Sequence, residues 1–286
     1  MTDIYLGIDQ GSGSSKAILI NKEGKTLFFD SISISSSFPS LEKVEQDGEE
    51  ILESILELVI RAKTFSRKSN LRILSMGFSC QRSGVIAWEK SGHSVSKLIS
   101  WRDARNKLAI QKLAINEKEI FELSGLPLTY HYAALKISKF QDEFKDNKIF
   151  IGTLDSFVLY NLLSDHPFIT EESHACRSQL YGINTNDWHN RLISIFSVDQ
   201  KRLAKIVPSF YDFGLIQDLP LRFVVGDQQA ALISYRSLET PILNIGTVAS
   251  IVIDTKESVT CHNGYLSALT YSSQSCLLYT SPSPRD

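Results

Sequence analysis

The sequence lacks a long hydrophobic run and an excess of charge of either sign. No segment approaches the ~18 consecutive apolar residues of a membrane-spanning helix, and the N-terminus has no basic region before an apolar core. We therefore expect neither a transmembrane helix nor a signal peptide. A net charge of −2 gives no electrostatic basis for binding nucleic acid or an anionic membrane. The composition thus predicts no nucleic-acid and no membrane partner.

Cysteine motifs are missing as well. The four cysteines are scattered and show no C-x-x-C spacing, at Cys80, Cys176, Cys261 and Cys276. This pattern argues against a zinc site or a disulfide framework, so we expect free thiols in a reducing compartment and a cytoplasmic protein. With 286 residues, the chain is long enough for one large domain and part of another.

The stretch at 4–20 (IYLGIDQGSGSSKAILI) is the most informative feature that is present. Two short apolar runs predict buried strands, and small polar residues join them. In such a turn, backbone N–H groups can approach an anion closely, with hydroxyls and a lysine as further donors. Asp9, at the end of the first run, is placed to hold a hydrated Mg²⁺. The residues expected to face a phosphate are Gly11, Ser12, Gly13, Ser14, Ser15 and Lys16.

Known phosphate motifs do not match this turn. The spacing is wrong for a Walker A loop, and a dinucleotide fingerprint needs a third glycine and a following helix. A structural turn with no ligand remains an open alternative at this point.

Hydrophobic periodicity and turn residues predict most other elements. An amphipathic helix is expected at 49–63, and a helix at 115–124 should end at Gly125 in a C′ position. The remaining predictions are strands at 25–34, 71–79, 84–88, 221–226, 242–245 and 248–254, helices at 104–113, 133–144, 153–163 and 190–196, and a loop at 35–48. The polar segment 170–181 shows no assignable pattern.

Several polar and aromatic residues are candidates for a binding site. Arg82, between two predicted buried strands, needs an acceptor, which either a structural ion pair or a ligand would provide. Trp101 offers an aromatic plane beside polar groups and, together with Arg82, suits a polyhydroxylated ligand, although a lone tryptophan is more often part of a core. His131 lies in an irregular loop, where most histidines are surface or structural residues.

A second acidic strand end occurs at Asp227. A strand runs into Gly226 and a helix is expected from Gln228. Asp227 is therefore either a simple N-cap or a carboxylate held to accept a proton from a hydroxyl. Gly246 and Thr247 then repeat the strand, small residue, strand pattern of the opening, as a second candidate phosphate turn.

Taken together, these segments resemble the FGGY carbohydrate kinases, most closely the glycerol kinase branch. The matches follow the family order over about residues 4–272, at 7–17, 81–82, 99–105, 152–156, 170–180 with 184–188, 226–232 and 246–247. The resemblance implies an α/β chain of the actin-like ATPase (ribonuclease H-like) fold, with an active site between two related domains.

The same resemblance implies ATP and Mg²⁺ as cofactors and ATP-dependent phosphorylation of a polyol or sugar hydroxyl. Asp227 would be the general base, and Asp9 and Asp227 would serve the metal. The turn from Gly11 to Lys16, with Gly246 and Thr247, would line the phosphate path. The substrate would contact Arg82, Ser83, Trp101, His131, Asp227 and Gln228.

Three positions depart from the glycerol kinase pattern. Ser83 replaces a glutamate, His131 stands where a tyrosine is expected, and Ser250 replaces an aromatic residue. These changes favour a longer polyol or a ketose over glycerol. The alternative is a non-catalytic sugar- or nucleotide-binding protein with a regulatory role. A third possibility, an actin-like assembly ATPase, gives no reason for Trp101 or for the Gln81-Arg82 pair.

Family members are much longer than this chain. We expect a complete substrate-binding domain at 1–238, the start of a nucleotide-binding domain at 239–275 and a non-native tail at 276–286, because the ending CLLYTSPSPRD matches nothing in the family. A full-length form is expected to allow homo-oligomers.

Overall fold

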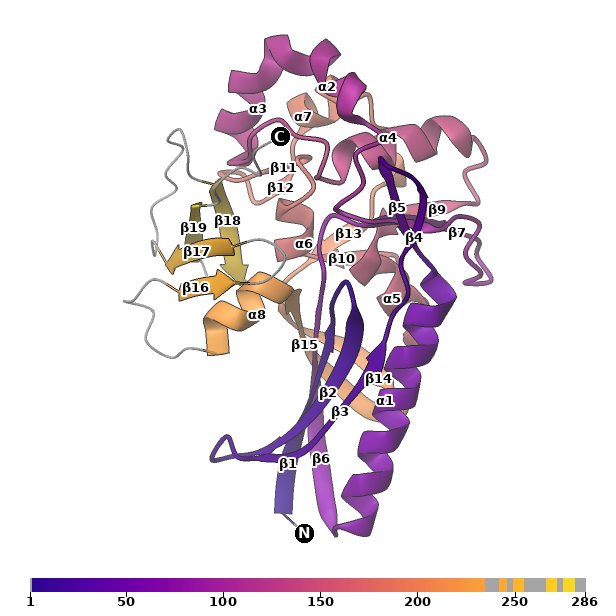
Figure 1. Cartoon of the computed structure of the whole chain (residues 1–286), viewed down its shortest axis with the longest axis vertical. Helices are drawn as coiled ribbons and strands as arrows, with labels where there is room; N and C mark the ends of the chain where they lie inside the picture. The colour runs from indigo at the N-terminus through magenta and orange to yellow at the C-terminus, as the bar shows by residue number, and fades with distance from the viewer. Residues whose placement is uncertain (1, 235–241, 246–248, 255–265, 272–274, 281–286) are drawn as a thin grey trace.

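A six-stranded mixed sheet forms the lower half of the molecule (Figure 1). The computed structural model describes residues 2–234, 242–245, 249–254, 266–271 and 275–280. The strand order is β14-β15-β6-β1-β2-β3, and β1–β2–β3 is an antiparallel meander, as predicted, while β6 and β15 run parallel to β1. The bounds are β1 (Thr2–Gln10), β2 (Ser14–Asn21), β3 (Thr26–Ser33), β6 (Leu71–Cys80), β14 (Phe210–Ile216) and β15 (Leu219–Gly226).

The helix α1 (Gly48–Lys68) covers one face of this sheet (Figure 1). Alternate residues of β1 point toward it, and Ile4, Leu6 and Ile8 are buried in the shared core. The Asp47 side chain caps the helix by accepting a hydrogen bond from the Glu49 N–H, and basic residues occupy the last turn. The predicted helix at 49–63 is confirmed and extends to residue 68.

A second sheet lies above the first, with strand order β4-β5-β8-β7-β9. The loop predicted at 35–48 is wrong, because the hairpin of β4 and β5 forms there. Strand β5 is held in place by β8, where Glu45 pairs with Ile99, a partner that local composition does not reveal. The bounds are β4 (Ser37–Ser40), β5 (Lys43–Gln46), β7 (Val85–Trp88), β8 (Leu98–Ile99) and β9 (Phe150–Thr153).

Helices fill the space around the second sheet. α5 is buried on almost every side and packs Phe157 edge-on against Trp88, as suits a helix between two sheets. α3 ends at Gly125, whose φ of +72° is the predicted left-handed cap. The helices here are α2 (Lys107–Leu113), η1 (Ala114–Asn116), α3 (Glu117–Ser124), α4 (Ala134–Glu143), α5 (Leu154–Leu162) and α7 (Asn190–Ile195). The predicted helices are thus confirmed, although the one expected from residue 104 begins at Lys107, after a turn.

The segment that showed no pattern, 170–181, falls in short elements. It contributes to β10 (Ile169–Glu171), α6 (Glu172–Cys176) and β11 (Tyr181–Gly182). These elements are too short for a periodicity to appear. The neighbouring elements are β12 (Asp187–Trp188), η2 (Gln200–Arg202), β13 (Lys205–Val207) and α8 (Asp227–Ser234).

A small antiparallel sheet with strand order β16-β17-β19-β18 lies beyond α8. Its strands are β16 (Ile242–Ile245), β17 (Ala249–Asp254), β18 (Leu266–Tyr271) and β19 (Ser275–Thr280), so the strands predicted at 242–245 and 248–254 are confirmed. The Ser267 N–H donates to the Gly125 carbonyl (3.0 Å), which joins β18 to the rest of the chain.

Three further predictions concern this end of the chain. Gly246 and Thr247 lie outside the described residues, as does the side chain of Ser250. Residues 276–280 of the expected tail belong to β19, and 281–286 lie outside the described residues. The division into domains stays a prediction.

Two observations concern the features that the sequence lacks. No helix among the described residues combines the length and the apolar character needed to cross a membrane. Cys80 and Cys176 are buried free thiols, as expected.

Candidate functional site

Three neighbouring strands end at one edge of the six-stranded sheet. Asp9 of β1 lies in register with Ser79 of β6, and Ser79 with Val225 of β15. Since β1, β6 and β15 are parallel, the residues that follow them meet at the same edge, where ligands of open α/β sheets commonly bind. The sheet thereby brings the predicted residues Asp9, Arg82 and Asp227 together.

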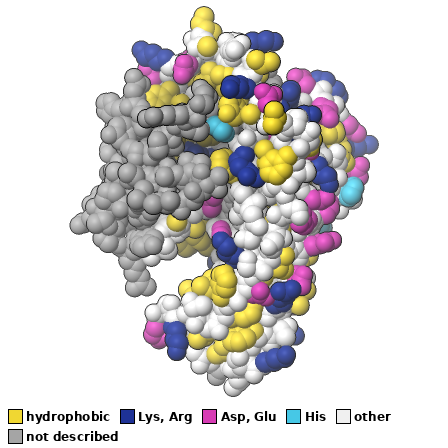
Figure 2. Space-filling model, in the orientation of Figure 1, with side chains coloured by type: hydrophobic (Ala, Val, Ile, Leu, Met, Phe, Trp, Pro, Cys, Tyr) yellow, Lys and Arg dark blue, Asp and Glu magenta, His cyan; other side chains and the backbone are white. Residues whose placement is uncertain are grey.

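Asp9 stands on the sheet face that α1 does not cover. It accepts a hydrogen bond from the Ser79 hydroxyl (2.8 Å), and the Lys16 ammonium lies 4.0 Å from its other oxygen. Burial raises the pKa of Asp9 above its ordinary value, and the negative charge of Asp227 raises it further. A hollow of about 270 Å³ beside Asp9 is lined by residues of β1, β2, β3 and β6. Figure 2 shows the molecule indented on this side, with acidic and basic side chains on the wall.

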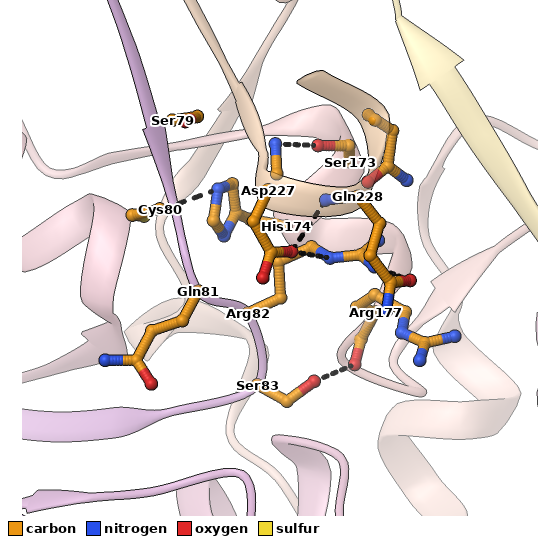
Figure 3. Close-up of polar contacts among 12 residues, drawn as sticks. Ser79, Cys80, Gln81, Arg82, Ser83, Ser173, His174, Arg177, Asp227 and Gln228 are labelled. Carbon is orange, nitrogen blue, oxygen red and sulfur yellow. Dashed lines mark hydrogen bonds and ion pairs between the residues drawn. The ribbon is translucent and has the colours of Figure 1, made fainter. Parts of the chain in front are cut away.

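Arg82 and Asp227 form an ion pair (Figure 3), with 3.4 Å between Nε and Oδ1. The Arg82 side chain is 4% exposed and the Asp227 side chain 42% exposed, so the arginine holds the carboxylate from the protein side. Arg82 also donates through Nη2 to Oε1 of Gln228 (2.6 Å). Asp227 accepts from the Gln228 N–H (2.8 Å) at the start of α8. The structural ion pair considered for Arg82 is therefore present. Asp227 is the first residue of α8 and accepts from the next residue's N–H, so it is not the N-cap considered for it, and the rest of its carboxylate faces solvent.

Close packing beside Gly226 fixes the position of Arg82. A Cβ atom on Gly226 would lie 2.3 Å from Cδ of Arg82 and 2.9 Å from Oε1 of Gln229. Only glycine leaves room for the arginine at this point of the backbone.

The turn between β1 and β2 is tied to Trp101. The indole Nε1 donates to the Ser12 hydroxyl (2.9 Å), which in turn donates to Oε1 of Gln81 (3.1 Å). Gln81 is buried and donates to the side chains of Gln10 and Gln46. Sequence reasoning missed Gln46, because the loop predicted at 35–48 hid the strand that carries it.

The rest of the predicted phosphate turn has mixed orientations. The Gly11 N–H donates to the Ser14 carbonyl (2.9 Å), which closes the turn. A Cβ atom on Gly13 would meet no described atom within 4 Å, so the backbone there is open to approach. The Ser15 hydroxyl faces the other way, fully buried and hydrogen-bonded to the Ser54 hydroxyl (2.7 Å). The Ser15 hydroxyl therefore does not face an anion in the turn.

Lys136 links the two remaining predicted substrate residues. Its fully buried ammonium donates to the carbonyls of Ser83 (2.8 Å) and His131 (2.7 Å). His131 contacts the carbonyl of Trp101 through Nδ1 (3.1 Å), and burial lowers the pKa of His131. Ser83 has a left-handed backbone with φ of +66°. Sequence reasoning missed Lys136, since a lysine in an amphipathic helix normally faces solvent.

The donor chemistry of the edge suits a Mg²⁺ ion. Asp9 and Asp227 present hard carboxylate oxygens that stay partly exposed, and their mutual repulsion would be relieved by a cation. Within the residues that the structure describes, no three His, Cys, Asp or Glu side chains gather into a ready-made metal site. The two carboxylates would thus need further oxygens from phosphates or water, which is the usual situation for Mg²⁺.

Solved structures share this fold. The chain superimposes on the crystal structure of Plasmodium falciparum glycerol kinase with ADP at a TM-score of 0.91, with 21% identity, covering 98% of this chain and 61% of the other. For a ligand-bound xylulose kinase from Lactobacillus acidophilus the TM-score is 0.85, with 16% identity and coverage of 97% and 59%. The predicted α/β chain of the actin-like ATPase class is confirmed.

Sequence comparison gives the family. A glycerol kinase from Bdellovibrio bacteriovorus is 32% identical over 95% of this chain and 59% of its own length. A glycerol kinase from Coxiella burnetii is 27% identical over 95% of this chain and 58% of its own length, so the chain spans less than two thirds of these relatives. The family model of the FGGY carbohydrate kinases, N-terminal domain, matches residues 4–237. The chain belongs to the FGGY family of carbohydrate kinases.

Proposed function

We propose that the protein takes part in the ATP-dependent phosphorylation of a sugar or polyol hydroxyl. The observation that carries this proposal is the placement of Asp9 and Asp227 at one sheet edge, at the ends of β1 and β15 on either side of β6. The negative charge of Asp227 accordingly raises the pKa of Asp9. A kinase needs one carboxylate near the metal-bound phosphates and one near the attacking hydroxyl. Membership of the carbohydrate kinase family supports the same reaction class.

Asp227 is the proposed general base. The substrate hydroxyl gives its proton to the Asp227 carboxylate as its oxygen forms a bond to the γ-phosphorus, and the bond from that phosphorus to the bridging oxygen of ADP breaks. The half-exposed carboxylate is accessible to a hydroxyl, and the ion pair with Arg82 sets its orientation. Positioning of this kind accounts for much of the catalysis in phosphoryl transfer.

Hydroxyl groups of the substrate would meet the polar side chains of Arg82 and Gln228, while Trp101 supplies an apolar plane. Ser83 and His131, whose carbonyls are joined through Lys136, would be further substrate contacts. Ser83 is smaller than the glutamate of glycerol kinases and carries no charge. A longer polyol or a ketose is therefore the proposed substrate class.

The turn from Gly11 to Lys16 is the proposed phosphate contact, through its backbone and the Lys16 ammonium, with Gly246 and Thr247 as the second turn. Asp9 and Asp227 would hold the Mg²⁺ ion. When bound, the metal neutralises charge on the phosphates. The predicted homo-oligomer and the cytoplasmic location remain expectations.

An ATP-consumption assay of the intact protein over a panel of polyols and ketoses tests this proposal. We expect turnover with at least one longer polyol or ketose and weaker turnover with glycerol. Intrinsic tryptophan fluorescence, compared between the wild type and Trp101→Phe because Trp88 and Trp188 also emit, reports ligand binding in parallel. Binding of a polyol without turnover by any member of the panel would overturn the kinase proposal and favour a regulatory binding protein.

A further inference from the structure

Glu171 is a buried carboxylate that the proposed reaction does not use. It lies at the end of β10, is fully buried, and accepts three hydrogen bonds. The Ser173 N–H (2.9 Å) and the Ser173 hydroxyl (2.6 Å) both donate to Oε2, and the Ser209 hydroxyl donates to Oε1. A buried carboxyl group costs stability unless such donors surround it, so its presence here calls for a reason.

The hydroxyl of Ser173 connects Glu171 to the candidate site through hydrogen bonds. A serine hydroxyl has one proton, and that proton goes to Glu171, so its oxygen is left to accept. The Gly226 N–H donates to this oxygen at 2.8 Å, as Figure 3 shows. Both donors of Ser173 go to Oε2 of Glu171. With the carboxylate ionised, the hydrogen bonds therefore run from the Gly226 N–H to the Ser173 hydroxyl and from that hydroxyl to Glu171.

Gly226 is the residue immediately before Asp227, and two groups hold it from different sides. The Arg82 side chain packs against its Cα, and the Ser173 hydroxyl binds its amide. The backbone that leads into the Asp227 carboxylate is thus anchored to a side chain from a different element, α6.

We propose that Glu171, acting through Ser173, is a positioning residue that fixes the backbone at Gly226 and thereby aims the Asp227 carboxylate. This proposal rests on the proposed function, because it assigns Asp227 the role of base. The Ser209 hydroxyl donates to Oε1 of Glu171 and so helps to hold the carboxyl group in place. Asp155, whose Oδ2 accepts from the Glu171 N–H (2.9 Å), fixes the backbone at the start of this chain of bonds.

Hydrogen exchange of the Gly226 amide tests the anchor directly, without any need for activity. In Ser173→Ala and Glu171→Gln we expect this amide to exchange about tenfold faster than in the wild type, because its acceptor is lost or displaced. Ser173→Thr, which keeps the hydroxyl, should retain the protection. Ser66→Ala removes a buried serine hydroxyl in the last turn of α1, where it donates to the Leu71 carbonyl at the start of β6, and is the matched control. Wild-type protection of Gly226 in Ser173→Ala would overturn the anchor.

Steady-state kinetics of the intact protein test the effect on the base. We expect kcat of Ser173→Ala and Glu171→Gln to fall about 10- to 100-fold, with KM for the hydroxyl substrate within about twofold. Ser173→Thr should restore kcat, and Ser66→Ala should not change it. Faster amide exchange with unchanged kcat would overturn the positioning role. If the wild type turns over no substrate, the proposed function fails and amide exchange alone decides on the anchor.

Discussion

The guanidinium of Arg82 lies 3.4 Å from the carboxylate of Asp227, with the arginine buried and the aspartate half exposed. This ion pair joins the segment after β6 to the first residue of α8. It lies at the sheet edge where β1, the strand that carries Asp9, also ends. Each group thus depends on a strand that is distant in sequence.

Replacing Arg82 should remove both the orientation of Asp227 and a substrate donor. We expect kcat/KM of Arg82→Ala to fall at least about 100-fold. The free energy of unfolding should fall by only about 1–2 kcal/mol, because the half-exposed Asp227 can be hydrated. Arg82→Lys keeps the charge but not the planar fork that reaches both Asp227 and Gln228, so it should rescue little activity. Near-normal kcat/KM in both variants, measured with chemical denaturation in parallel, would show that the pair has no role.

Substitution of Gly226 should act through the same arginine. In Gly226→Ala the new methyl group would lie 2.3 Å from Cδ of Arg82, so the side chain must move. We expect a loss of about 1–3 kcal/mol in the free energy of unfolding. Gly13→Ala is the matched control, because its methyl group meets no described atom, and its stability should stay within about 0.5 kcal/mol of the wild type. Urea unfolding of the two variants compares them, and equal stability would refute the packing argument.

Lys136 should give the protein a pH-dependent stability. Burial lowers the pKa of Lys136 to about 7, while the unfolded chain keeps the ordinary value of 10.5. Between these values the unfolded state holds one more proton, so raising the pH stabilises the folded state, by at most about 1.4 kcal/mol per pH unit. This contribution is complete above pH 10.5 and is lost as the pH falls through 7.

The comparison with Lys136→Met isolates this effect from other titrating groups. The charged neighbours of Lys136 are Asp103 and Arg105, which stay unchanged in the variant. We expect the stability difference, wild type minus variant, to grow as the pH rises from 7 to 10. A difference that is flat over this range, in urea unfolding at several pH values, would contradict a buried lysine with a lowered pKa.

Asp9 should matter for Mg²⁺–ATP and not for folding. Its raised pKa means that burial and the charge of Asp227 oppose its ionised form. Asp9→Asn should therefore leave the melting temperature unchanged or higher, while the affinity for Mg²⁺–ATP falls at least about tenfold. In the wild type, protons should compete with the metal at a higher pH than for an ordinary aspartate. Calorimetric titration with Mg²⁺–ATP, repeated with EDTA, checks this, and unaltered affinity in Asp9→Asn would count against the metal role.

Much of the fold could be predicted because its signals are local. The meander β1–β3 and the helix α1 follow from the spacing of apolar residues. The hairpin of β4 and β5 could not be predicted, because its stability depends on pairing with β8. Local composition at 35–48 has the serines and proline of a loop, and only the distant strand makes it a sheet edge.

Only some residues of the candidate site could likewise be predicted from the sequence. Asp9, Arg82 and Asp227 could be named from strand ends, and the register of the parallel strands explains why they meet. Lys136 and Glu171 could not be predicted, because the sequence does not reveal that a charged residue is buried. The orientation of Ser15 toward Ser54 was equally hidden, because a turn motif does not say which hydroxyl faces the core.

The most direct test of the account is the rate of phosphoryl transfer by Asp227→Asn in the intact protein. Asparagine keeps the shape of the side chain but cannot take a proton from the substrate hydroxyl. With the polyol or ketose that the wild type turns over best, we predict a fall in kcat of about 10²- to 10⁴-fold, with binding of the substrate largely retained. A kcat close to the wild-type value would contradict the assignment of Asp227 as the base.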